Sequence, residues 1–386
     1  MKKILIFIML LAIIVTGCGM NGPSGSTESG KNPAEAAKTE DTETENTEPE
    51  NAVMEGTAET ESRGGIPEAQ KEIFAMDTYM TLTGYGERSQ EAVEAAAEEI
   101  VRLDEMLSVG NENSEIAQIN RNGKGKISED TEIMLEEAIS LFETTKGAFD
   151  ITVYPLMEAW GFTTQNYQVP DKTVLETVLK AVDASAVQYD SQTDEVVLAN
   201  NQGIDFGGIA KGYASGRVMQ IFEEYDLVSG MVSLGGNVQC YSSKTDGTPW
   251  RVGISNPNTG EDGTDLLGVV SVTDKAVITS GGYERYFTDP KTGKTYHHII
   301  DPATGYPAEN GLTSVTIVSG NGMLADGLST AVFIMGREKA ADYWRQYGDE
   351  FEMILMADDG TVSVTEGLED SFTTEFSLSV IKRKEE

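Results

Sequence analysis

Apolar residues recur with helical spacing in five stretches of the chain. In residues 88–107 they return every three or four positions and line one face, which is typical of an amphipathic helix packed on a core. Gly147 follows the second stretch as a helix stop, and Asp171 opens the third as an N-cap. The pattern predicts helices over residues 88–107, 131–146, 171–182, 208–225 and 323–335.

Short apolar runs of the kind that form strands lie mostly in the second half of the chain. Helices therefore concentrate early and strands late, without a regular alternation of the two. We expect an α+β fold in one domain over residues 71–386, rather than a doubly wound parallel sheet. The predicted strands cover residues 195–199, 231–234, 250–254, 267–272, 296–300, 313–318 and 352–356.

The N-terminal residues form a separate pattern. Lys2 and Lys3 precede an apolar run over residues 4–15, which is shorter than the roughly 20 residues of a membrane-spanning helix. Together with the small residues that follow, this order predicts an export signal over residues 1–17. Val-Thr-Gly-Cys resembles the lipobox of bacterial lipoproteins, which implies lipidation of Cys18 and anchoring at the outer face of the bacterial cell membrane. The alternative is an ordinary signal peptide with an incidental cysteine.

Residues 18–70 are predicted to form a flexible acidic linker that begins at the lipidated cysteine. Residues 19–70 contain no aromatic residue and carry 12 acidic and three basic side chains, a composition that cannot form a core. The whole chain has a formal charge of −36, and residues 71–386 hold 52 acidic against 23 basic side chains. This charge excludes a nucleic-acid-binding function based on phosphate contacts. An anionic ligand would need a metal ion, backbone amides or a few chosen cations.

Residues 205–212 (Asp-Phe-Gly-Gly-Ile-Ala-Lys-Gly) join a β-prone segment to a predicted helix. Glycines at the start of a helix let backbone N–H groups approach a phosphate, and Lys211 adds a positive charge there. The spacing matches neither the Walker A loop nor the usual dinucleotide-binding fingerprint. A plain helix entry is the alternative interpretation.

Asp326 and Thr330 lie four residues apart in the predicted helix 323–335, so their oxygens share one face. A carboxylate and a hydroxyl suit Mg²⁺, which takes few protein oxygens and completes its shell with phosphate and water. The alternative is an aspartate at a helix N-terminus beside an unrelated threonine.

The two histidines, His297 and His298, are adjacent in the predicted strand 296–300. Neighbouring strand residues point to opposite faces, so only one of them can face a given site as a general acid or base. A surface histidine is the alternative. Arg285 stands alone among aromatic residues, where a structural ion pair is the plain interpretation. Cys240 is expected to be a small buried residue rather than a nucleophile.

Taken together, these segments resemble the ApbE family, flavin transferases that move FMN from FAD onto a threonine or serine of a protein. The resemblance covers residues 74–336. Many members of the family are exported lipoproteins, which agrees with the predicted signal and linker. The motifs that carry it are Met76-Asp77-Thr78 and residues 108–120, 147–150, 205–214, 234–237, 280–287, 298–307 and 325–336.

The resemblance implies roles for individual residues. His298 would be the catalytic histidine, and Mg²⁺ would be held by Asp326, Thr330 and the backbone carbonyl of Gly208. Asp77 and Gly110 depart from the family, which commonly has a glycine and a tyrosine there, so a stacking surface for part of FAD is missing at Gly110. The residues implied to bind FAD are Met76, Gly110, Ala148, Phe149, Asp150, Asp205, Lys211 and Ile300.

The implied activity is a metal-dependent transfer. An acceptor hydroxyl attacks the FMN-side phosphorus of FAD and AMP leaves, while His298 or a nearby carboxylate helps to remove the proton. The expected acceptor is a Thr or Ser of a membrane-associated redox subunit, and no nucleic acid is expected as a partner. The alternatives are an FAD pyrophosphatase, with water in place of the hydroxyl, and a non-catalytic flavin-binding lipoprotein.

Overall fold

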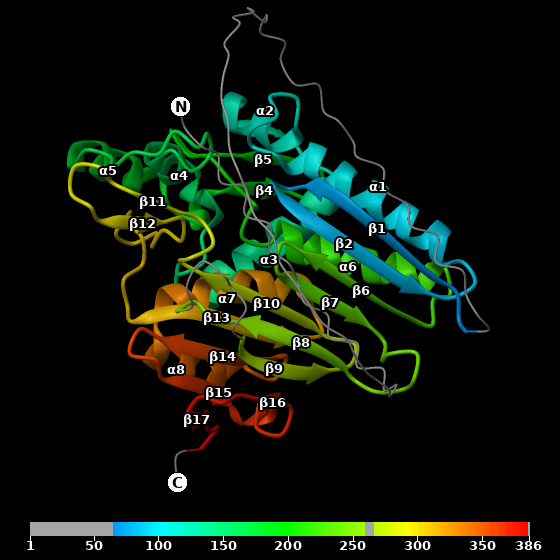
Figure 1. The fold of residues 1–386 in the computed structure, drawn as a ribbon. Helices are drawn as coiled ribbons and strands as arrows, with labels where there is room; N and C mark the ends of the chain where they lie inside the picture. Colours follow the sequence, from blue (N-terminus) through cyan, green and yellow to red (C-terminus); the bar gives the residue numbers. More distant parts are fainter. Residues whose placement is uncertain (1–64, 259–265, 385–386) are drawn as a thin grey trace, which may run out of the picture. The chain divides into compact units, whose positions relative to one another are not determined.

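Nine strands form the central sheet of the computed structural model, which describes residues 65–258 and 266–384 (Figure 1). All neighbouring pairs are antiparallel except β15 and β17. This mixed chain with an almost wholly antiparallel sheet confirms the expected α+β class. In spatial order the strands are β1 (Glu68–Ala75), β2 (Thr78–Tyr85), β6 (Ser229–Leu234), β7 (Asn237–Tyr241), β10 (Ala276–Gly281), β13 (Leu312–Ser319), β14 (Phe351–Ala357), β15 (Val362–Thr365) and β17 (Leu378–Ile381).

Helices cover one face of this sheet, and their apolar sides bury the main core (Figure 1). Ile100, Phe222 and Phe333 come from three different helices and are at most 1% exposed. This core fixes the helices on the strands. The helices of this layer and its flank are α1 (Ser89–Leu107), α2 (Glu115–Asn122), α3 (Glu129–Thr144), α6 (Ala210–Glu224), α7 (Gly322–Met335) and α8 (Arg337–Tyr347).

The opposite face of the sheet packs on a smaller sheet in the order β16, β9, β8. Its strands are β8 (Trp250–Ser255), β9 (Leu266–Val272) and β16 (Phe372–Thr373). Cys240 lies in this second core with 1% exposure, and burial raises the pKa of its thiol to about 12. The expectation of a buried, unreactive Cys240 is confirmed.

A third apolar cluster lies around Trp160, between short helices and a small hairpin. Its elements are α4 (Tyr154–Trp160), α5 (Lys172–Val178), β11 (Tyr286–Thr288) and β12 (Thr295–His297). The indole N–H of Trp160 donates to the carbonyl of Gly305 at 2.8 Å and so ties the turn after His298 to α4. The remaining strands, β3 (Lys124–Lys126), β4 (Gln188–Asp190) and β5 (Glu195–Val197), form a separate three-stranded sheet.

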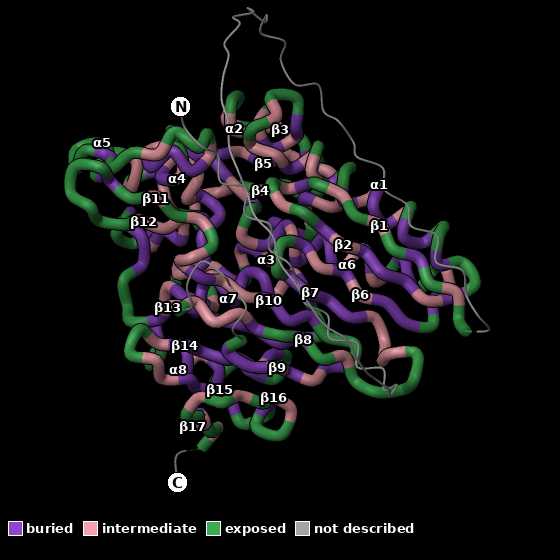
Figure 2. Tube along the Cα trace, viewed as in Figure 1, coloured by how far each residue is buried: buried purple, intermediate pink, exposed green. Residues whose placement is uncertain are grey.

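The linker boundary expected at residue 70 is wrong by three residues, because β1 begins at Glu68. β1 alternates between buried and exposed positions, whereas β13 is buried along nearly all of its length (Figure 2). An edge strand with polar residues on its outer face resembles a linker in composition. The expected strand 296–300 is also shorter, since β12 ends at His297.

The predicted signal and Cys18 lie outside the described residues. Within the described ranges, no helix is both long and apolar enough to cross a membrane.

Candidate functional site

Two glycines bring the N-terminal ends of α6 and α7 into close contact. A Cβ atom on Gly212 would lie 2.2 Å from the carbonyl oxygen of Gly322 and 2.6 Å from Cβ of Asp326. A Cβ on Gly322 would in turn lie 2.7 Å from the carbonyl oxygen of Gly212. Since real Cβ atoms do not approach so closely, only glycine allows this crossing. The crossing places Asp326 of α7 against the first turn of α6.

The Asp326 carboxylate is 5% exposed and held at both oxygens. The backbone N–H of Gly212 donates to Oδ2 at 2.8 Å, and the side-chain amide of Asn237 donates to Oδ1 at 3.0 Å. Burial raises the pKa of Asp326, while the positive charge of Lys211 and the two hydrogen bonds oppose that rise. Asp326 therefore does not cap its own helix, and the interpretation of it as a plain N-terminal aspartate is wrong.

The carbonyl of Gly208 is left without a hydrogen bond from any described residue. A regular helix would direct the N–H of Gly212 to the carbonyl four residues earlier, which is that of Gly208, but this N–H binds Asp326 instead. The Thr330 hydroxyl, one turn after Asp326, also has no hydrogen-bond partner among the described residues. A buried carboxylate and two oxygens without partners form a donor set that suits a hard cation.

This donor set contains a single carboxylate. Within the described ranges, no group of three or more His, Cys, Asp or Glu side chains could hold a metal ion. Mg²⁺ keeps several waters and is usually bound through one or two carboxylates plus substrate phosphates. The residues present therefore fit Mg²⁺ and do not fit a closed site such as that of structural zinc.

Lys211 lies in the first turn of α6 and has no carboxylate within 4.0 Å among the described residues. Burial raises the pKa values of three acids, Asp205, Glu284 and Asp326, and the charge of Lys211 opposes each rise. Glu284 is solvent-accessible, but the surrounding protein removes much of its hydration, and this effect together with Asp326 raises its pKa to about 7. Sequence reasoning did not single out Glu284.

The amides at the entry of α6 are only partly available to a ligand. The N–H of Gly207 donates to Oδ1 of Asp205 at 2.8 Å, so the expectation that it would bind a phosphate is not met in this arrangement. The N–H of Gly208 has no such partner among the described residues. Burial raises the pKa of Asp205, and the charges of Arg285 and Lys211 oppose that rise.

The two histidines have different surroundings. His297 uses both ring nitrogens within the protein, since Nδ1 accepts from the N–H of Ile299 and Nε2 donates to the carbonyl of Ala308. His298 donates from Nδ1 to the carbonyl of Arg285 at 3.1 Å, which leaves Nε2 as an acceptor. Burial, reinforced by the charge of Arg285, lowers the pKa of His298 to about 3. Of the two histidines, only His298 has a free ring nitrogen, although the expected strand that would place them on opposite faces ends at His297.

Some residues expected to bind FAD lie beside this cluster. The Phe149 ring lies 3.0 Å from where a Cβ of Gly208 would stand and also faces Gly327 of α7. Ala148 precedes it in the same turn. Met76 and Asp77 form the two-residue turn between β1 and β2, with φ values of 48° and 59°. Aspartate tolerates this left-handed conformation, so the departure at Asp77 is accommodated.

Three other expected residues have different surroundings. Asp150 is used inside the protein, because its oxygens accept from Thr152 and from the N–H of Ala184. The Ile300 side chain is buried in the Trp160 cluster. Gly110 is exposed, and no described contact joins it to Asp326 or Lys211.

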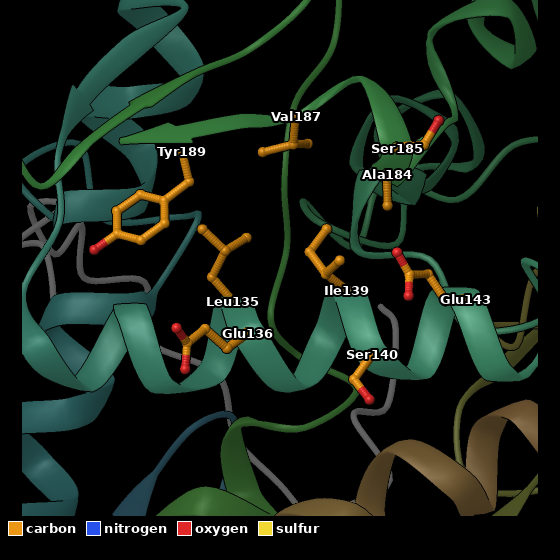
Figure 3. A pocket seen from close by; sticks show the side chains of 9 residues that line it. All are labelled: Leu135, Glu136, Ile139, Ser140, Glu143, Ala184, Ser185, Val187 and Tyr189. Carbon is orange, nitrogen blue, oxygen red and sulfur yellow. The ribbon is translucent and has the colours of Figure 1, made fainter. Parts of the chain in front are cut away.

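A hollow of about 520 Å³ lies elsewhere, between α3 and residues 184–189. Side chains of Leu135 and Ile139 face Val187 and Tyr189 across it (Figure 3). None of the expected site residues lines this hollow. It therefore gives no support to a flavin site away from Asp326.

Asn237 lies at the centre of the cluster, and although residues 234–237 were among the motifs of the family resemblance, the sequence assigned no role to this residue. The sequence feature that could have identified Asn237 is its position directly after two glycines. Gly235 and Gly236 form a tight turn with φ values of 60° and 98° between β6 and β7. This turn packs against Thr78 and brings Asn237 to the Asp326 carboxylate.

The model of the ApbE family matches residues 76–355. A relative from Treponema pallidum named FAD:protein FMN transferase is 31% identical over 317 residues, which cover 76% of this chain and 86% of the relative. A relative of the same name from Haemophilus influenzae is 29% identical over 295 residues, which cover 73% of this chain and 83% of the relative.

Two solved structures have the same fold. The ApbE protein of Thermotoga maritima has 33% sequence identity and a TM-score of 0.72, covering 78% of this chain and 97% of that one. The flavinyl transferase ApbE of Pseudomonas stutzeri, solved in its apo form, has 24% identity and a TM-score of 0.71, covering 81% of this chain and 99% of that one.

Proposed function

The chain belongs to the ApbE family, and we propose that it transfers FMN from FAD to a threonine or serine hydroxyl of an acceptor protein, with release of AMP. The observation that carries this proposal is the oxygen cluster of Asp326, Thr330 and Gly208 beside Lys211. Such a cluster suits a cofactor with two linked phosphates. The folded part is acidic and would repel these phosphates, and a divalent cation and a lysine together offset that repulsion.

The transfer exchanges the phosphoanhydride bond of FAD for a phosphoester bond to the acceptor. The acceptor oxygen bonds to the phosphorus next to the riboflavin part, the bond from that phosphorus to the bridging oxygen breaks, and AMP leaves with the bonding electrons. The hydroxyl proton goes to a base. Such reactions depend mainly on positioning and on offsetting negative charge.

Mg²⁺, held by Asp326, Thr330 and the Gly208 carbonyl, would offset charge on the phosphate oxygens. Lys211 binds the same phosphates from the first turn of α6, where the helix dipole also favours negative charge. Gly212 and Asn237 hold the Asp326 carboxylate in one orientation. Phe149 packs behind the glycine turn and keeps Gly208 in place.

His298 accepts the hydrogen bond of the incoming hydroxyl through Nε2. Its Nδ1–H is bound to the Arg285 carbonyl, which orients the ring. Because the pKa of His298 is about 3, the ring is neutral at neutral pH and this nitrogen is ready to accept. Glu284, with a pKa of about 7, is a stronger base than His298 and is the carboxyl group that would retain the proton.

The proposed location is the outer face of the bacterial cell membrane, with Cys18 lipidated and residues 19–70 as a spacer. The acceptor is then a membrane-associated redox subunit. The sequence Val-Thr-Gly-Cys supports this assignment. Labelling of cells with a fatty-acid analogue should mark the wild-type protein but not Cys18→Ser, and a wild-type protein without label would contradict lipid anchoring.

The test of function is the intact mass of an acceptor protein. The full-length chain in detergent is incubated with FAD, Mg²⁺ and an acceptor that carries the target threonine, and the acceptor should gain the mass of FMN less one water. Asp326→Asn, which keeps the size and shape of the side chain but replaces one accepting oxygen with an N–H₂ donor, should abolish the gain. Free FMN and AMP with an unchanged acceptor would indicate an FAD pyrophosphatase, and intact FAD would indicate a binding protein.

A further inference from the structure

Arg285 carries a half-buried positive charge without a carboxylate partner. It lies in the turn between β10 and β11, and among the described residues no Asp or Glu oxygen comes within 4.0 Å of its guanidinium. One terminal N–H₂ group donates to the carbonyl of Phe162 at 3.1 Å, while Nε is buried without any hydrogen-bond partner. The structural ion pair expected from the sequence is therefore not formed.

An unpaired guanidinium is unexpected in this chain. Residues 71–386 hold more than twice as many acidic as basic side chains, so a carboxylate partner was easily available. Nε is too enclosed for a ligand to reach, but the side chain as a whole is only half-buried, so its other N–H groups are the ones open to a ligand. The Phe162 ring lies 5.8 Å from the guanidinium carbon and limits its movement. A guanidinium fixed in this way presents a fork of N–H groups that matches phosphate.

The position of Arg285 connects it to the reacting end of the site. Its carbonyl accepts hydrogen bonds from both the backbone N–H and Nδ1 of His298, at 3.0 and 3.1 Å. Its charge lowers the pKa values of His298 and Asp205. Because His298 is the residue proposed to meet the acceptor hydroxyl, the phosphate nearest to it is the one that is attacked.

We propose that Arg285 binds the phosphate attached to the riboflavin part of the flavin, the phosphate that is transferred. This inference rests on the proposed function and adds a specificity-determining residue to it. Arg285 and Lys211 then divide the two phosphates between them, with Arg285 on the flavin side. Replacing Arg285 should therefore leave the affinity for a flavin without this phosphate unchanged.

The test compares FMN with riboflavin as ligands of Arg285→Gln in the full-length protein with Mg²⁺. Dissociation constants come from quenching of flavin fluorescence, with riboflavin also measured by competition against FAD. The affinity for FMN and FAD should fall by about tenfold or more, which corresponds to one charge-assisted contact, and riboflavin affinity should not change. Arg251→Gln, an exposed arginine of β8, is the control and should leave all three affinities unchanged.

Arg285→Lys separates binding from a structural role. Lysine keeps the charge but not the fork, so FMN affinity should lie between those of the wild type and Arg285→Gln. An unchanged FMN affinity in Arg285→Gln, or equal losses for FMN and riboflavin, would overturn the proposal. If wild-type riboflavin binding is too weak to measure, the FMN affinity of Arg285→Lys is the deciding measurement. An FMN affinity of Arg285→Lys no higher than that of Arg285→Gln would then overturn the proposal. Because binding needs no acceptor, a failure of transfer in the wild type would refute the proposed function and not this contact.

Discussion

The candidate site has two halves that are built in different ways. The helix half consists of Gly208, Gly212, Asp326 and Thr330 at the crossing of α6 and α7, and the turn half consists of Arg285 and His298 beside the Trp160 cluster. In the helix half, backbone contacts fix the position of the carboxylate, and both of its oxygens are already bonded. In the turn half, a guanidinium nitrogen and a ring nitrogen remain without partners.

This difference indicates that the fold itself holds the Asp326 carboxylate of the helix half in place, whereas the charged group of the turn half is completed by its ligand. Changes to the glycines at the crossing should therefore remove folding stability and activity together. Changes in the turn half should alter binding or pH dependence while the fold persists. The following variants test that division, from the largest expected effect to the smallest.

Gly212→Ala should have the largest effect. Its new Cβ would meet the Gly322 carbonyl and Asp326, so the helices must separate, which lowers the free energy of unfolding by about 3 kcal/mol and abolishes transfer. Urea unfolding and the acceptor mass assay measure the two effects. Gly216→Ala is the matched control in the same helix, where nothing lies within 4 Å, and it should be stabilising by about 0.5–1 kcal/mol. Equal behaviour of the two variants would contradict the close crossing.

Thr330→Val should separate activity from stability within the helix half. The hydroxyl has no hydrogen-bond partner among the residues that the structure describes, so its loss should leave the free energy of unfolding nearly unchanged while Mg²⁺ affinity and transfer fall by about 100-fold. Titration of Mg²⁺ against transfer rate measures this, and Thr330→Ser should retain activity. Ser329→Ala removes a hydroxyl bonded to the Asp326 carbonyl and should lower stability more than Mg²⁺ affinity. If Ser329→Ala lowered Mg²⁺ affinity more than Thr330→Val does, the metal would be bound elsewhere.

His298→Asn tests the electrostatics of the turn half. The pKa of His298 is about 3 in the folded protein against 6.5 ordinarily, so between these values the unfolded state binds a proton that the folded state does not. The wild type should lose up to about 1.4 kcal/mol of stability per pH unit as the pH falls through this window, and the variant should lack that loss. Urea unfolding at pH 7, 6 and 5 measures the difference. Parallel curves would show that the ring is protonated in the folded state.

Trp160→Phe should have the smallest effect. It removes the N–H that donates to Gly305 and should lower the free energy of unfolding by about 1–2 kcal/mol while transfer persists. Trp250→Phe is the control, because within the described part of the chain the Trp250 indole N–H has no hydrogen-bond partner, and its loss should be nearly neutral. Stability loss in both variants alike would point to ring volume rather than to the hydrogen bond.

Sequence patterns were most informative for the helix half. Asp326 and Thr330 follow from helical spacing, because that period holds wherever a helix forms. The role of Gly212 could not be predicted, since it depends on which helix crosses which. Asn237 was missed for the same reason, because its contact with Asp326 joins β7 to α7. β1 was hidden by its polar outer face, and the unpaired state of Arg285 depends on contacts that no local pattern contains.

The pairing of β2 with β6 has a consequence for how the chain folds. β2 ends at Tyr85 and β6 begins at Ser229, so the hairpin of β1 and β2 leaves the ribosome long before its sheet neighbour exists. Contacts between segments so distant in sequence form slowly. Until β6 arrives, one edge of that hairpin is exposed to other chains. Nascent chains that stop before residue 229 should therefore be the most aggregation-prone intermediates in the synthesis of this protein.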